Sequence, residues 1–84
     1  MFEKALEIGV TEANKFLGKM EEEDKNIEKS IFYYQKAIDY GDVDSQFYLA
    51  CIYQDDEKFK DIKKAYQMFW KLHEDGNFFY FIYF

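Results

Sequence analysis

The sequence predicts an all-α fold of stacked helical hairpins, and three observations point to this class. The 84 residues contain no proline, which suits an uninterrupted helical array. Apolar side chains recur at the spacing of one helical face; examples are Ile27, Ile31, Tyr34 and Ile38. A short sequence motif that begins with lysine and ends with glycine also occurs three times along the chain, at residues 4–9, 36–41 and 71–76.

The three copies of this motif divide the chain into repeats. Their closing glycines lie 32 and 35 residues apart, and self-similarity at such a period is typical of a stacked helical repeat. We therefore expect one domain over residues 1–84. Its parts are a partial repeat 1–9, repeat one 10–41, repeat two 42–76 and a partial repeat 77–84.

The first repeat boundary is expected at Gly9. Residues 2–8 are predicted to form a short helix that ends at this glycine, and residues 11–20 to form the next helix. The apolar side of that second helix is expected to carry Ala13, Phe16, Leu17 and Met20. The acidic stretch 21–25 has neither the alternate oxygen ligands nor the central glycine of a calcium loop, and is read as a solvated connection.

The middle of the chain reads as two helices joined by a tight corner. Asn26 is placed to cap a helix that runs to residue 40, and Gly41 can take the positive φ that closes it. Asp42 then offers a side-chain oxygen to cap a helix over residues 43–54. The face of this helix toward its partner is expected to hold Ser45, Leu49, Ala50 and Tyr53.

The last full helix is expected to start near Asp61 and to close at Gly76. Its buried set is predicted to be Ile62, Ala65, Tyr66, Phe69, Trp70 and Leu72. A sixth helix would begin after Asn77. Its residues 78–84 are all apolar, which predicts self-association through stacked ends, or a longer array. The residues expected to carry self-association are Phe78, Phe79, Phe81, Ile82 and Phe84.

The charge balance limits the kinds of partner. The chain has 17 acidic residues against 11 basic ones and a net charge of −6, which disfavours nucleic acid and an anionic membrane. A single cysteine rules out an internal disulfide and any cysteine-cluster metal site. No secretory signal or membrane-spanning run is visible, so a cytoplasmic location is expected, with a secreted effector left open.

Catalytic motifs are absent from the sequence. It shows no Cys/His dyad and no glycine-rich phosphate loop, so an enzyme is only a remote alternative, and no cofactor or metal site is expected. Cys51 lies in mid-helix without an adjacent basic residue, which predicts an inert, part-buried thiol. His73 is a lone histidine and is read as a surface residue.

The repeated sequence resembles the Sel-like repeat, a relative of the tetratricopeptide repeat. The matching residues of repeat two are Lys29, Ser30, Tyr34, Lys36, Ala37, Gly41, Ser45, Leu49, Ala50 and Tyr53. A second set is Lys64, Ala65, Phe69, Lys71, Gly76 and Tyr80, and a partial set is Lys4, Ala5, Gly9, Ala13, Leu17 and Gly18. The resemblance implies α/α hairpins stacked into a right-handed superhelix, and an adaptor that binds other proteins without catalysis.

In such a superhelix the first helix of each hairpin lines the concave face, where a peptide or partner protein would bind. The residues expected there are Glu12, Lys15, Lys19, Asp44, Phe47, Cys51, Gln54 and Asp55. Phe47 lies off the packing stripe of its helix and would serve as an aromatic anchor for such a partner. The alternative, which the sequence leaves open, is that Phe47 packs against the adjacent repeat.

Overall fold

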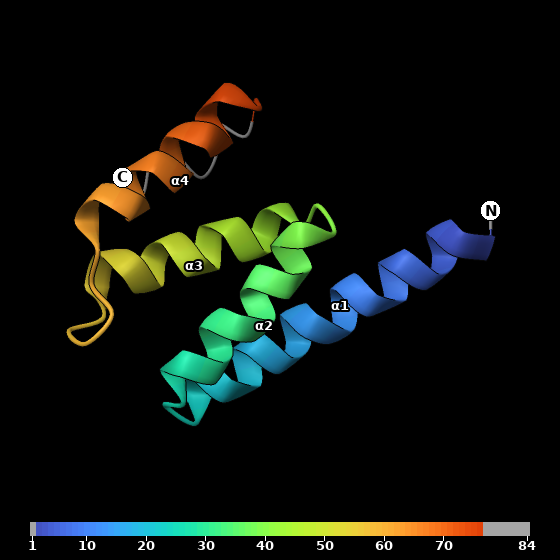
Figure 1. Cartoon of the computed structure of the whole chain (residues 1–84), viewed down its shortest axis with the longest axis horizontal. Helices are drawn as coiled ribbons and strands as arrows, with labels where there is room; N and C mark the ends of the chain where they lie inside the picture. Colours follow the sequence, from blue (N-terminus) through green and yellow to red (C-terminus); the bar gives the residue numbers. More distant parts are fainter. Residues whose placement is uncertain (1, 77–84) are drawn as a thin grey trace. The chain divides into compact units, whose positions relative to one another are not determined.

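The computed structural model describes residues 2–76, with side chains from residue 8 onward, and this part of the chain is all-helical (Figure 1). Its helices are α1 (Phe2–Glu23), α2 (Ile27–Asp39), α3 (Val43–Asp55) and α4 (Ile62–Glu74). None of these helices is both long and apolar enough to cross a membrane. The chain forms two compact units, Met1–Ser45 and Gln46–Phe84. The predicted all-α class is confirmed.

The first helix differs from its prediction. Residues 2–8 are not a separate helix, because α1 continues through Gly9 without a break. A glycine inside a helix costs about 1 kcal/mol relative to alanine, whereas ending the helix there would leave backbone groups without partners. The following residue, Val10, has no side-chain oxygen with which to cap a new helix. The expected helix boundary at Gly9 is therefore wrong.

The turn from α1 to α2 satisfies the last carbonyl groups of α1. Lys25 takes a left-handed conformation with φ 64°, and the amide of Asn26 donates to the carbonyl of Glu21 at 2.8 Å. Asn26 occupies the predicted N-cap position of α2, but its side chain makes no cap hydrogen bond. Its amide group donates instead to Oε2 of Glu21, at 2.9 Å. The position was predicted correctly and the capping interaction was not.

The packing of α1 on α2 is centred on a glycine. Gly18 is buried and lies against the ring of Tyr34, which is fully buried, as are Ser30 and Ala37 on the same helix. Phe16 and Met20 were expected on the packed side of α1, but 64% and 42% of their surfaces are exposed. Each lies two positions from Gly18, about 200° around the helix. A glycine in the contact lets a large tyrosine ring approach, and this orientation turns Phe16 outward.

The corner between α2 and α3 is built as predicted. Gly41 has φ 94°, a conformation that favours glycine, and it ends α2. Oδ2 of Asp42 accepts a hydrogen bond from the backbone amide of Ser45 at 2.8 Å, which caps the first turn of α3. Ser45, at the end of the first unit, is fully buried.

In the second unit, α4 starts and ends where the sequence predicted. Asp61 caps α4 by accepting from the amide of Lys64 at 3.1 Å, and Gly76 ends it with φ 88°. Among the described residues of this unit, the buried ones are Leu49, Ala50, Ile52, Ala65, Phe69 and Leu72. Three members of the predicted buried set are instead exposed: Ile62 at 41%, Tyr66 at 52% and Trp70 at 53%.

Candidate functional site

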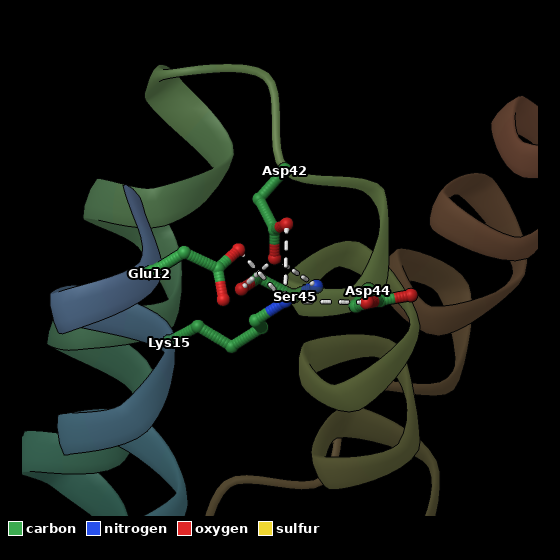
Figure 2. Close-up of polar contacts among 5 residues, drawn as sticks. All are labelled: Glu12, Lys15, Asp42, Asp44 and Ser45. Atoms are coloured by element: carbon green, nitrogen blue, oxygen red, sulfur yellow. Dashed lines mark hydrogen bonds and ion pairs between the residues drawn. The ribbon is translucent and has the colours of Figure 1, made fainter. Parts of the chain in front are cut away.

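Three of the predicted binding residues meet in one ion cluster within the first unit (Figure 2). Nζ of Lys15 lies 3.2 Å from Oε1 of Glu12, one turn earlier on α1, and 3.3 Å from Oδ2 of Asp44. It also lies 3.8 Å from Oδ1 of Asp42, whose other carboxylate oxygen holds the amide of Ser45. One lysine therefore joins the middle of α1 to the first residues of α3.

The electrostatics of this cluster keep Lys15 charged. Burial of the side chain by itself would lower its pKa, but the hydrogen bond to Glu12 and the charge of Asp42 outweigh that effect. The pKa of Lys15 is consequently raised above its usual 10.5. The ammonium group is thus engaged by carboxylates of its own chain, which makes it a structural link between the two helices.

Asp42 was predicted as a cap but not as a partner of Lys15. The two residues lie far apart in sequence, and Asp44 is 29 residues from Lys15. No periodicity of one helix could place them together, because their meeting depends on how α1 packs beside the corner at Gly41. Lys19, the remaining predicted residue of α1, is exposed one turn farther along the helix.

The predicted residues of α3 divide into packed and exposed ones. The ring of Phe47 meets the buried ring of Phe69 on α4 edge to face, with centroids 6.1 Å apart. Phe47 is therefore half-buried and packs on the partner helix within its own unit. The sequence had left open whether Phe47 is a bare anchor or packs against the adjacent repeat. Cys51 is half-buried and Asp55 is exposed.

Gln54 borders a hollow between α3 and α4 that the sequence did not predict. The hollow has a volume of about 60 Å³, which suits one small aliphatic side chain, and its other lining residues are Ile62, Ala65, Tyr66 and Phe69. Apart from the Gln54 amide and the Tyr66 hydroxyl, the lining is apolar. The sequence does contain one signal that could have predicted this hollow: the apolar face of α4 is wider than one neighbouring helix can cover.

A second hollow of about 340 Å³ lies on the first unit and is lined by Val10, Asn14, Lys36, Asp39 and Tyr40. Two of its polar side chains have local partners. The Asn14 amide donates to the carbonyl of Val10, and Nζ of Lys36 sits 5.0 Å from the ring centroid of Phe32. These contacts engage two of the polar side chains that border the hollow.

The five residues expected to carry self-association, in the aromatic segment 78–84, lie outside the described residues. Within residues 2–76, no group of three or more histidine, cysteine or acidic side chains is arranged to hold a metal ion.

Comparison with known proteins adds no relative. No family model matches the chain, and no curated protein or solved structure is detectably similar to it. The resemblance to the Sel-like repeat therefore stays a prediction that rests on the residues given above.

Proposed function

We propose that this protein is an interaction scaffold of the Sel-like kind, built from α/α hairpins in a solenoid, which binds a peptide or partner protein without catalysing a reaction. The helical content and the turns at Gly41 and Gly76 support this architecture. The proposal places binding on the second unit, because the predicted residues Glu12, Lys15 and Asp44 are already engaged with one another in the ion cluster.

The observation that carries the proposal is the exposed apolar face of α4. Ile62, Tyr66 and Trp70 follow one another at intervals of four residues, so they lie along one side of the helix. We call these three residues the α4 face. Single exposed apolar residues are ordinary, but a continuous row beside a hollow is typical of an interaction surface. The hollow lined by Gln54 opens beside this row.

The shape and chemistry of this surface define the ligand that it would take. An apolar side chain of the partner would enter the hollow, and Tyr66 and Trp70 would cover its flanks, as aromatic residues do at binding hot spots. The Gln54 amide can donate to and accept from a peptide backbone. The partner is thus a segment with an apolar anchor, either extended or helical.

Self-association through residues 78–84 is the second candidate function. It is favoured by the seven consecutive apolar residues 78–84, because exposing such a segment to water is unfavourable unless another surface buries it. Mass measurement with and without residues 81–84 tests it, since loss of a dimer on deletion is the expected result.

The main proposal is tested by selecting peptides from a random library against the full chain. Trp70 is the only tryptophan, so its fluorescence reports a ligand on the α4 face directly. Ile62→Glu should weaken the selected peptides at least about tenfold, whereas Phe32→Glu, at an exposed site on α2, should leave their affinity unchanged. Equal binding to both variants would place the binding surface elsewhere.

A further inference from the structure

The first unit carries an exposed apolar row of its own, on α1. Ile8, Phe16 and Met20 are all exposed. Phe16 and Met20 lie on the side of α1 turned away from Gly18, whereas Ile8 lies about 80° around the helix from Gly18. We call these three residues the α1 face. Glu12 occupies the turn between Ile8 and Phe16, and Glu23 falls on the same side of the helix.

The α4 face is shorter than the α1 face. From Ile8 to Met20 the α1 face extends about 18 Å, and from Ile62 to Trp70 the α4 face extends about 12 Å. Two helices packed side by side can therefore cover the whole α4 face and about two-thirds of the α1 face. Each row is bounded by polar residues, as is usual where an apolar core has a polar rim.

The charges of the two helices are opposite in sign. α1 contains six glutamates and three lysines, whereas α4 contains three lysines and one glutamate. Lys63 and Lys71 are exposed on α4 together with Glu74, and Glu23 is exposed on α1 together with Lys19, while Glu12 is already paired with Lys15. The opposite net charges of the two helices favour their association and disfavour the contact of either helix with its own copy.

We propose that the α4 face of one molecule binds the α1 face of a second molecule of the same chain. This inference rests on the proposed function, since it names a partner for the same α4 surface. Phe16 is the most exposed large apolar residue among the described ones. Its side chain would be the anchor that packs against Tyr66 and Trp70 of the other molecule. The occupant of the α4 face is then an acidic amphipathic helix that this protein itself supplies.

Because the two faces differ, this contact is heterologous. Such a contact can repeat from molecule to molecule, either in a closed ring or in a head-to-tail chain, so the average mass rises with concentration. A tail-to-tail contact through residues 78–84 would instead close after one symmetric pairing. The two arrangements therefore predict different masses and a different response to mixed variants.

The test is sedimentation equilibrium of the full chain and of three variants. The wild type should grow in average mass with concentration. Phe16→Glu and Trp70→Glu should each lower the association constant at least about tenfold, while Phe32→Glu should not change it. An equimolar mixture of Phe16→Glu and Trp70→Glu should form dimers and nothing larger, because each variant retains one intact face. Far-UV circular dichroism of each variant confirms that the helices remain folded.

Three outcomes would overturn the inference: a wild type that stays monomeric up to about 1 mM, single variants that associate like the wild type, or a mixture that stays monomeric. The peptide titration by Trp70 fluorescence is independent of these masses. Peptides that bind a monomeric chain and are lost on Ile62→Glu would overturn self-recognition and leave the proposed function standing.

Discussion

Gly18 on α1 and Tyr34 on α2 lie in direct contact, and a β-carbon at position 18 would stand 2.6 Å from two carbons of the tyrosine ring. Tyr34 is fully buried, and its hydroxyl donates to Oε1 of Glu22 at 2.8 Å, so the ring is fixed at both ends. Ser30, one turn earlier on α2, donates from its hydroxyl to the carbonyl of Gly18 at 2.9 Å. The glycine is therefore the point where the two helices touch.

Gly18→Ala should destabilise the protein. Helix propensity alone would favour alanine by about 1 kcal/mol. The added methyl group must, however, displace a fully buried ring whose hydroxyl is held by Glu22. Overpacking of this kind costs about 1–3 kcal/mol, so we expect a net loss in the free energy of unfolding, read from urea denaturation. An unchanged or higher midpoint would show that Tyr34 can shift.

Gly9→Ala is the matched control and should have the opposite effect. Position 9 is inside α1, and no atom lies within 4 Å of a β-carbon placed there. Alanine should therefore stabilise the helix by about 0.5–1 kcal/mol. Destabilisation by Gly9→Ala would indicate that the chain does break at this residue, as the repeat pattern predicted.

The sequence predicted the ends of helices better than their faces. Gly41 and Gly76 were recognised as helix ends because a glycine that follows an apolar periodic segment can take the left-handed conformation that ends a helix. Asp42 and Asp61 were recognised as caps because capping also depends only on neighbouring residues. Gly9 has the same sequence context, but α1 passes through it. A local signal therefore tells where a helix can end, while the surrounding backbone decides whether it does.

Lys15→Met should lower stability by about 0.5–1 kcal/mol, because the carboxylates of Glu12, Asp42 and Asp44 would lose the cation between them. The pKa of Lys15 is raised in the folded state, so its contribution is complete below the unfolded value near 10.5 and is lost as pH rises through the folded value. The difference between wild type and variant should be constant from pH 7 to about 10 and shrink above 10.5. Urea denaturation of both proteins across that range measures it; a difference that grows with pH would contradict the ion cluster.

The candidate site was predictable only in part, for a physical reason. Gln54, one of the expected binding residues, borders the hollow on α4, but the α4 face was expected to be buried because Ile62, Tyr66 and Trp70 are apolar. Periodicity shows that a helix has a wide apolar face and does not show how much of it a neighbour covers. The meeting of Lys15 with Asp44 depends on packing between distant segments, which no single-helix pattern contains.

Phe47→Ala should act on stability before it acts on binding. Its ring meets the buried Phe69 edge to face, so removing it opens space in the contact between α3 and α4. We expect a loss of about 1–3 kcal/mol in the free energy of unfolding, less than for a fully buried phenylalanine. Phe32→Ala, at a residue that is 55% exposed, should change it by less than about 0.5 kcal/mol. A Phe47→Ala protein of unchanged stability that no longer binds the selected peptides would contradict this assignment and return Phe47 to the role of an exposed anchor.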